Sequence, residues 1–173
     1  MVKGKTGFTL IELVIVIAIT ALVCTIAFVK LNNVDDLKYS SQEFVSRLKI
    51  AQNMAQTGQI CCARADTPVY YYVEFSRGTI DYSLKAVYRD NSVADLGAYK
   101  LTNSNIHFFQ CRDEAGAQDP CKIAFSLPNG QISWESSAVV GDVLLSIKDI
   151  DNGEVARIDL FPDTGIISDS YGY

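Results

Sequence analysis

The sequence predicts an α+β protein in which one long N-terminal helix precedes a head of antiparallel β-strands. Three observations favour this class. Residues 8–29 form an apolar run that contains one charged residue, Glu12. Apolar residues at helical spacing then continue to Gln56, and Gly58 is a natural helix stop. After Gly58, short runs rich in aromatic and β-branched residues alternate with turns that contain glycine.

The apolar run is long enough to cross a membrane. Its 22 residues would form a helix of roughly 33 Å, about the thickness of a hydrocarbon core. A cleaved secretory signal would be shorter and would end at a small-residue cleavage site, whereas this run continues as Lys30-Leu31-Asn32-Asn33. A plain membrane anchor leaves Glu12 unexplained, because a carboxylate in a spanning helix is costly and indicates function. We therefore expect residues 8–29 to be a transmembrane segment with a functional carboxylate.

The stretch Lys5-Thr6-Gly7-Phe8-Thr9-Leu10-Ile11-Glu12-Leu13 resembles the signature of type IV prepilins and of the pseudopilins of type II secretion. In that family a membrane-embedded prepilin peptidase cuts after the glycine, and the new N-terminal phenylalanine is N-methylated. The resemblance implies that residues 1–7 are a cleaved leader and that Phe8 is methylated. The basic leader implies a single pass through the bacterial inner membrane, with the head outside in the periplasm. Assembly would then place the subunit in a periplasmic or extracellular filament.

The resemblance also implies a role for Glu12 in assembly. Cleavage would leave a positive amine on Phe8, close to a carboxylate that is costly to bury without a partner. In the filament, Glu12 would meet the Phe8 amine of a neighbouring subunit and set the axial register between subunits. The alternative is a Glu12 side chain that is simply protonated near the lipid headgroups.

Residues 30–58 are expected to form the amphipathic half of the same helix. Their apolar stripe, widened by Val45 and Met54, consists of Leu37, Phe44, Leu48, Ala51 and Ala55. Residues 32–36 form a polar break in which Asn33 or Asp35 could cap a new helix. The helix is therefore expected to be either continuous or interrupted at this point.

Residues 59–173 are expected to form the β-rich head. The predicted strands lie at 69–75, 80–89, 106–111, 123–126, 131–134, 143–147, 155–160 and 165–167. Asn-Gly pairs at 129–130 and 152–153 predict tight hairpin turns, because such turns need positive φ angles. This pattern predicts an antiparallel sheet or sandwich onto which the helical stripe packs.

Five cysteines divide between the two parts of the chain. Cys24 lies in the apolar run, and the other four are Cys61, Cys62, Cys111 and Cys121. Four cysteines in an exported head favour two disulfides, with three possible connectivities, over buried reduced thiols. Cys111 and Cys121 flank a polar loop that a local disulfide between them could close. A disulfide from Cys61 or Cys62 to Cys111 or Cys121 would compete with this local bridge.

Other candidate sites are better explained by structure. The acidic stretch 149–154 slightly resembles a calcium loop, but its spacing favours a hairpin turn. His107 is the only histidine and has no accompanying nucleophile motif, and adjacent cysteines without a spacer do not form a zinc ligand pair. Tyr70-Tyr71-Tyr72 favours a core and edge role over a contact patch. We expect no cofactor, no metal and no enzymatic activity.

The C-terminal half carries a second resemblance. The segments 123–130, 143–147 and 156–165 are similar to the minor pilin family of the H-type pseudopilin and the T- and U-type minor pilins. This resemblance implies the type IV pilin fold and a minor subunit that helps to initiate the filament. The implied partners are other pilin subunits, the prepilin peptidase and the inner-membrane assembly platform. The alternatives are a major pilin of the filament shaft and a DNA- or substrate-binding tip pilin.

Charge argues against nucleic acid as a partner. The formal net charge is −5, and without Lys3 and Lys5 of the leader it becomes −7, from 13 basic and 20 acidic residues. Binding to phosphate backbones depends on Lys and Arg. DNA-binding members of the family carry arginines just after the final glycine, whereas residues 166–173 contain no basic residue.

Overall fold

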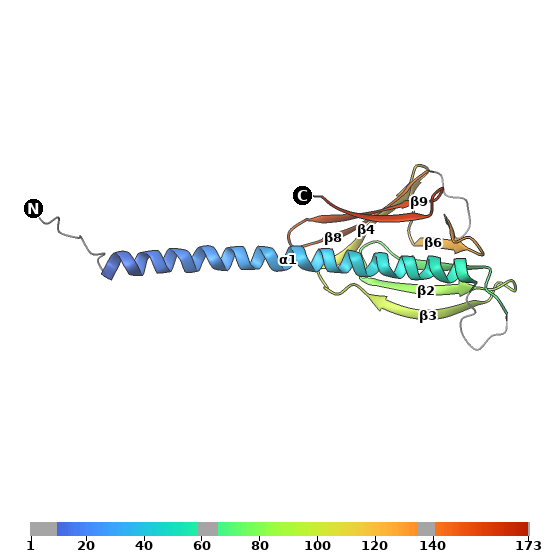
Figure 1. Ribbon diagram of the computed structural model, residues 1–173, viewed down its shortest axis with the longest axis horizontal. Helices are drawn as coiled ribbons and strands as arrows, with labels where there is room; N and C mark the ends of the chain where they lie inside the picture. The colour runs from blue at the N-terminus through green and yellow to red at the C-terminus, as the bar shows by residue number, and fades with distance from the viewer. Residues whose placement is uncertain (1–9, 59–65, 135–140, 173) are drawn as a thin grey trace, which may run out of the picture. The chain divides into compact units, whose positions relative to one another are not determined.

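The computed structural model describes residues 10–58, 66–134 and 141–172, with side chains left undescribed at 26–35 and 171–172. The chain consists of two compact units, Met1–Asp35 and Asp36–Tyr173, which are described separately below. The second unit contains the head and the part of the long helix that packs on it (Figure 1).

Helix α1 extends over Leu10–Thr57 and has 48 residues. It continues through residues 32–36, so neither Asn33 nor Asp35 caps a new helix and the polar break does not interrupt it. Helix growth is cooperative, and each Asn or Asp in a helix costs only about 0.7 kcal/mol relative to Ala. The helix ends as predicted before Gly58, which has a φ angle of 61°.

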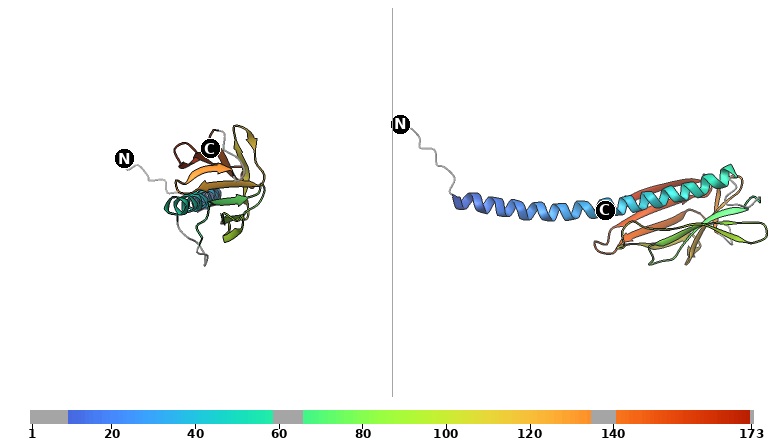
Figure 2. Two further views of the ribbon diagram at one scale, coloured as in Figure 1. Left: turned by 90° about the vertical axis from the view of Figure 1, so that its right-hand side faces the viewer. Right: turned by 90° about the horizontal axis from the view of Figure 1, so that it is seen from below.

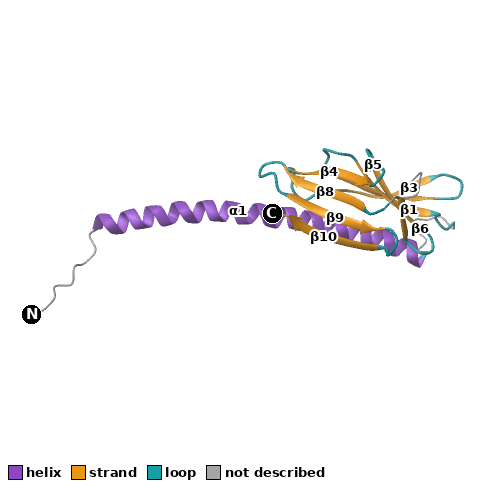
Figure 3. Ribbon diagram, turned by 90° about the horizontal axis from the view of Figure 1, so that it is seen from above, coloured by secondary structure: helices purple, strands orange, loops and turns teal. Residues whose placement is uncertain are grey.

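The head contains two five-stranded antiparallel sheets. The first sheet has the order β3-β2-β1-β6-β7 and is made of β1 (Tyr70–Phe75), β2 (Asp81–Val87), β3 (Val93–Lys100), β6 (Cys121–Ser126) and β7 (Gln131–Trp134). The second has the order β10-β9-β8-β4-β5 and is made of β4 (Ile106–Asp113), β5 (Gly116–Ala117), β8 (Val143–Asp149), β9 (Val155–Phe161) and β10 (Ile166–Gly172). Figure 3 shows the strands of the second sheet following one another from β10 to β4.

The α+β class predicted from the sequence is confirmed, because one helix precedes antiparallel sheets. Each of the eight predicted strands corresponds to a strand of the structure. Three elements differ: β3 and the two-residue β5 were not predicted, and β10 continues to Gly172 where the sequence predicted a strand only over 165–167.

One hydrophobic core joins both sheets to the second half of α1. The predicted stripe is buried, with Leu37, Phe44, Val45, Leu48, Ala51 and Ala55 all in this core. The ring of Phe44 contacts Phe75 and Tyr82 of the first sheet at centroid distances of 5.4 and 5.1 Å, and Phe108 of the second at 4.9 Å. Figures 1 and 2 show this half of α1 lying along the head, beside strands of both sheets. The helix therefore supplies the wall that closes the core.

Two further links connect the sheets. Cys111 of β4 and Cys121 of β6 form a disulfide with a Cα–Cα distance of 6.0 Å. The indole N–H of Trp134 in β7 donates a buried hydrogen bond of 2.8 Å to Asp113 Oδ2 in β4. Both links lie at the β4 end of the second sheet, away from the strands β9 and β10.

Candidate assembly site

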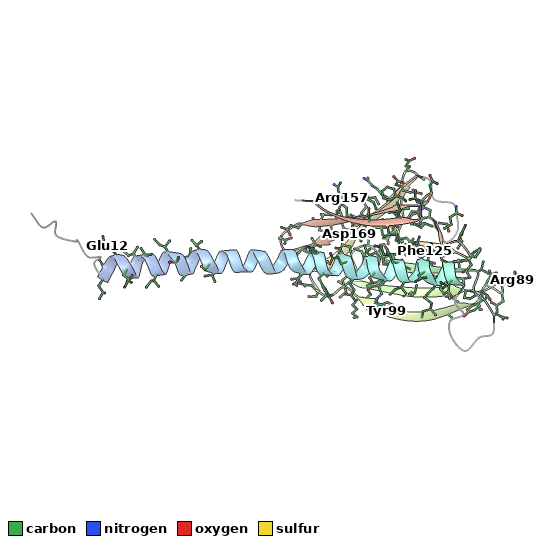
Figure 4. The ribbon with its side chains drawn as sticks, viewed as in Figure 1. Glu12, Arg89, Tyr99, Phe125, Arg157 and Asp169 are labelled. Atoms are coloured by element: carbon green, nitrogen blue, oxygen red, sulfur yellow. A yellow bond between two sulfur atoms is a disulfide. The ribbon has the colours of Figure 1, made fainter. Side chains whose placement is uncertain are left out.

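The first unit presents an apolar helical surface. From residue 10 to residue 25, where the side chains of α1 are described, every position is exposed and Glu12 is the one charged residue. Leu10 is 82% exposed, and Ile19, Leu22 and Val23 are each close to 60% exposed. A helix that is apolar on all sides needs lipid or other helices around it. Figure 4 shows Glu12 at the beginning of this surface.

Two threonines within this surface satisfy their hydroxyl groups inside the helix. Thr25 Oγ1 donates a hydrogen bond of 2.5 Å to the carbonyl oxygen of Ala21, and Thr20 Oγ1 donates to the carbonyl oxygen of Val16. A hydroxyl without a partner is costly in an apolar environment, and these bonds remove that cost. The threonines therefore fit a helix that is surrounded by apolar groups.

Glu12 is chemically different from these threonines. An ionised carboxylate only accepts hydrogen bonds, so it cannot bond the carbonyl oxygens of its own helix. Glu12 lies in the first turn of α1, where the positive end of the helix dipole favours a negative charge. A cation near this turn would be attracted by the same carboxylate.

The proposed processing site, Gly7 and Phe8, lies outside the described residues. Among the residues that the structure describes, no helix has the length and hydropathy needed to cross a membrane. The described side chains of α1 stop at residue 25 within the predicted span of 8–29 and begin again at residue 36. The membrane-spanning role of this segment therefore stays a prediction.

The structure describes three of the five cysteines. The local bridge between Cys111 and Cys121, one of the alternatives that the sequence left open, is present. Cys61 and Cys62 lie outside the described residues, and Cys24 is a free and exposed thiol.

The remaining candidates lie in the head. Within the stretch 149–154, Asp149 ends β8 and residues 150–154 form the turn to β9, and Asp149 Oδ1 accepts a hydrogen bond of 2.9 Å from the Asp151 backbone N–H. His107 lies in β4 opposite Lys148 of β8. Tyr71 is fully buried in the core, and Tyr72, on the other face of β1, is only 3% exposed. In the described parts of the chain, no group of three or more His, Cys, Asp or Glu side chains is placed to hold a metal ion.

Sequence reasoning missed one group of residues that ties the helix to the head. Gln52 of α1 contacts the turn at Gly165 and lies against the turn at Gly130. Both glycines belong to the C-terminal segments that resemble minor pilins, but nothing in the sequence showed that they face the same helical turn.

Comparison with known families gives one match. Residues 2–28 match the family described as the prokaryotic N-terminal methylation motif. This match covers the basic segment, Gly7, Phe8, Glu12 and most of the apolar run. No curated protein and no solved structure matches the chain significantly. The motif is of the type found in prepilin-like proteins, and it points to a structural subunit rather than to an enzyme.

Proposed function

We propose that this chain is a subunit of a type IV filament, either a type IV pilus or the pseudopilus of type II secretion. The observation that carries the proposal is the exposed apolar surface of residues 10–25 with Glu12 in its first turn, which lies within the methylation motif at 2–28. A helix of this kind needs other apolar helices around it once it leaves lipid. A filament core made of such helices meets that need.

Maturation follows from the motif. The prepilin peptidase cuts between Gly7 and Phe8, and Phe8 is then N-methylated. Residues 8–29 hold the subunit in the bacterial inner membrane, with the head in the periplasm, until the inner-membrane assembly platform transfers it to the filament. In the filament, the Glu12 carboxylate pairs with the Phe8 amine of a neighbouring subunit. Pairing stabilises the buried carboxylate only in the correct register, so it selects that register.

Within this class we propose a minor subunit that acts in filament initiation. Support comes from the C-terminal segments that resemble minor pilins, whose glycine turns both lie against α1. The alternatives are a major pilin and a tip subunit that binds DNA or another substrate. The acidic charge of −5 and the absence of basic residues from 166–173 disfavour DNA.

Intact-protein mass spectrometry of the membrane fraction, with and without the prepilin peptidase, tests maturation. We expect a chain that begins at methylated Phe8 only when the peptidase is present. An unchanged mass in both samples would overturn the proposal.

Assembly is tested with Glu12→Gln, which removes the charge and keeps the shape of the side chain. We expect normal cleavage but loss of the subunit from sheared filaments. Thr20→Val is the matched control, because the Thr20 hydroxyl bonds within its own helix and its removal leaves the surface apolar. Incorporation of Glu12→Gln at the level of the control would contradict the pairing role.

A further inference from the structure

A small cavity lies between the two sheets, beside the disulfide that joins them. Its volume is about 190 Å³, and the buried side chains of Phe75, Phe108, Cys111 and Cys121 form part of its lining. It lies next to β4 and β5, which Figure 3 shows together at one side of the head. The filament surface proposed above does not include it.

The inner wall of the cavity is aromatic. The rings of Phe75 and Phe108 are stacked with a centroid distance of 4.2 Å and an interplanar angle of 24°. A dry apolar cavity of roughly 150 Å³ is enough to hold a benzene molecule. The cavity therefore has the size and the lining for one benzene-sized ring, which would gain offset or edge contacts with this pair.

The lining of the cavity includes an exposed aromatic residue, Phe109, and a cation, Arg77. Phe109, 39% exposed, is the extra residue of a β-bulge in β4, and the bulge turns it out of the regular strand pattern. The Arg77 guanidinium lies 5.4 Å and the Lys148 ammonium 5.2 Å from the centre of the Phe109 ring. The ring thus attracts both cations, and Arg77 is the one that belongs to the lining of the cavity.

One negative charge is also present at the mouth. Asp119 lines the cavity, and its Oδ1 accepts a hydrogen bond of 3.2 Å from the Arg77 backbone N–H. That bond gives the Asp119 carboxylate a backbone partner, and the Arg77 guanidinium is the positive charge of the lining. An anionic group of a ligand can therefore pair with Arg77.

We propose that this cavity binds an aromatic ring with a carboxylate next to it. The ring enters between the sheets and packs on the Phe75–Phe108 pair, and the carboxylate stays at the mouth near Arg77. A guanidinium binds a carboxylate through charge-assisted hydrogen bonds, so the charge contributes directly to affinity. The same chemistry is offered by a free aryl carboxylic acid and by a phenylalanine beside a glutamate in a partner chain.

Ligand-observed NMR on the full-length protein in lipid nanodiscs tests this inference. The probes are phenylacetate, its uncharged analogue 2-phenylethanol, and a capped peptide that contains Phe-Glu. We expect phenylacetate or the peptide to bind, and 2-phenylethanol to bind more weakly. Binding of phenylacetate alone identifies a small molecule as the ligand, and binding of the peptide alone identifies a partner chain. Binding of neither carboxylate probe overturns the inference.

Two variants separate the ring site from the charge. Arg77→Gln should weaken binding of the carboxylate probe by about tenfold and leave 2-phenylethanol unchanged, because only the ion pair is lost. Ala117→Leu places a larger side chain in the exposed β5 lining and should abolish binding of all probes. Ala115→Leu is the matched control, since Ala115 lies in the turn just before β5 and does not line the cavity. Equal binding by wild type, Arg77→Gln and Ala117→Leu would overturn the inference.

Discussion

The side-chain amide of Gln52 in α1 donates a hydrogen bond of 2.7 Å to the carbonyl oxygen of Gly165, in the turn between β9 and β10. The backbone carbonyl oxygen of Gln52 also faces Gly130, in the turn between β6 and β7, and would lie 3.1 Å from a Cβ atom placed there. One residue of the helix therefore contacts a turn of each sheet. This arrangement fixes how the two sheets are placed on the helix.

Gly130→Ala should destabilise the head by about 2–5 kcal/mol, because two costs are combined. The φ angle of 66° costs an L-residue about 1–2 kcal/mol. The new Cβ would also lie 2.7 Å from Gln56 Cγ and 3.1 Å from the Gln52 carbonyl oxygen, an overpacking cost of about 1–3 kcal/mol. The measurement is the free energy of unfolding from urea denaturation.

Gly153→Ala is the matched control for that prediction. Its φ angle of 78° imposes a similar backbone cost, but no atom lies within 4 Å of the added Cβ. We expect Gly153→Ala to lose only about 1–2 kcal/mol. Equal losses for the two variants would show that the close approach to α1 contributes nothing.

Asp113→Ala should cost about 2–3 kcal/mol, since it leaves the indole N–H of Trp134 buried without its acceptor. The other carboxylate oxygen of Asp113 accepts hydrogen bonds from the backbone N–H groups of Ala115 and Gly116, at 2.9 and 3.0 Å. Asp113→Asn retains one carbonyl oxygen and should lose less. Urea denaturation measures both losses.

Asp81→Ala serves as the comparison for Asp113, because Asp81 forms an exposed ion pair of 3.3 Å with Lys100. Exposed ion pairs contribute about 0–1 kcal/mol. A loss for Asp113→Ala no larger than that of Asp81→Ala would contradict the role given to the buried carboxylate.

Replacing Cys111 and Cys121 together by serine should lower the free energy of unfolding by about 2–3 kcal/mol. The bridge spans a sequence separation of 10, and the estimate follows from the chain entropy of a loop of this length. The check is urea denaturation of the wild type and of the double variant, each with and without reductant. Reductant should destabilise the wild type to the level of the variant, and an unreduced wild type no more stable than the variant would refute the prediction.

Burial of its side chain, reinforced by the nearby Glu43 carboxylate, raises the pKa of Tyr82 to about 12. In the unfolded chain a tyrosine ionises near 10. Between these two values the folded state holds a proton that the unfolded state has lost, so the stability from this tyrosine is fully present below about pH 10 and falls as the pH rises towards 12.

Ultraviolet titration of phenolate absorption in the folded protein measures this effect. Tyr82→Phe should remove one tyrosine ionisation near pH 12. Tyr39→Phe, which removes an exposed tyrosine, should leave the absorption change near pH 12 intact. An unchanged titration near pH 12 in Tyr82→Phe would contradict the raised pKa of Tyr82.

Strong periodic signals made most of the fold predictable. The helical stripe around Phe44 and Leu48 and the aromatic strand at 69–75 combine apolar side chains with a clear period. Strand β3 lacked such a signal, since it contains Ala94, Asp95 and Gly97 and lies half-exposed at the edge of its sheet. The end of β10 is rich in serine, and its pairing with β9 comes from tertiary structure rather than from propensity.

The candidate assembly site can be recognised in the sequence, whereas the contacts within the head cannot. Glu12 stands out because its charge interrupts an apolar run, which is visible in sequence alone. The contacts of Gln52 with two distant turns, and the cavity beside Phe109, depend on how the two sheets meet. No local sequence pattern predicts how the two sheets pack, because the residues in contact are far apart in the chain.

The disulfide between β4 and β6 also affects how the head would respond to tension. In the filament proposed above, load would stretch each subunit, and any head that unfolds would release chain length. The bridge holds its two Cα atoms 6.0 Å apart, whereas the ten residue steps between them could extend to about 35 Å if the bridge were reduced. Full unfolding of the oxidised head therefore releases about 30 Å less chain length than full unfolding of the reduced head. The bridge thus stabilises each subunit and also limits how far it can lengthen.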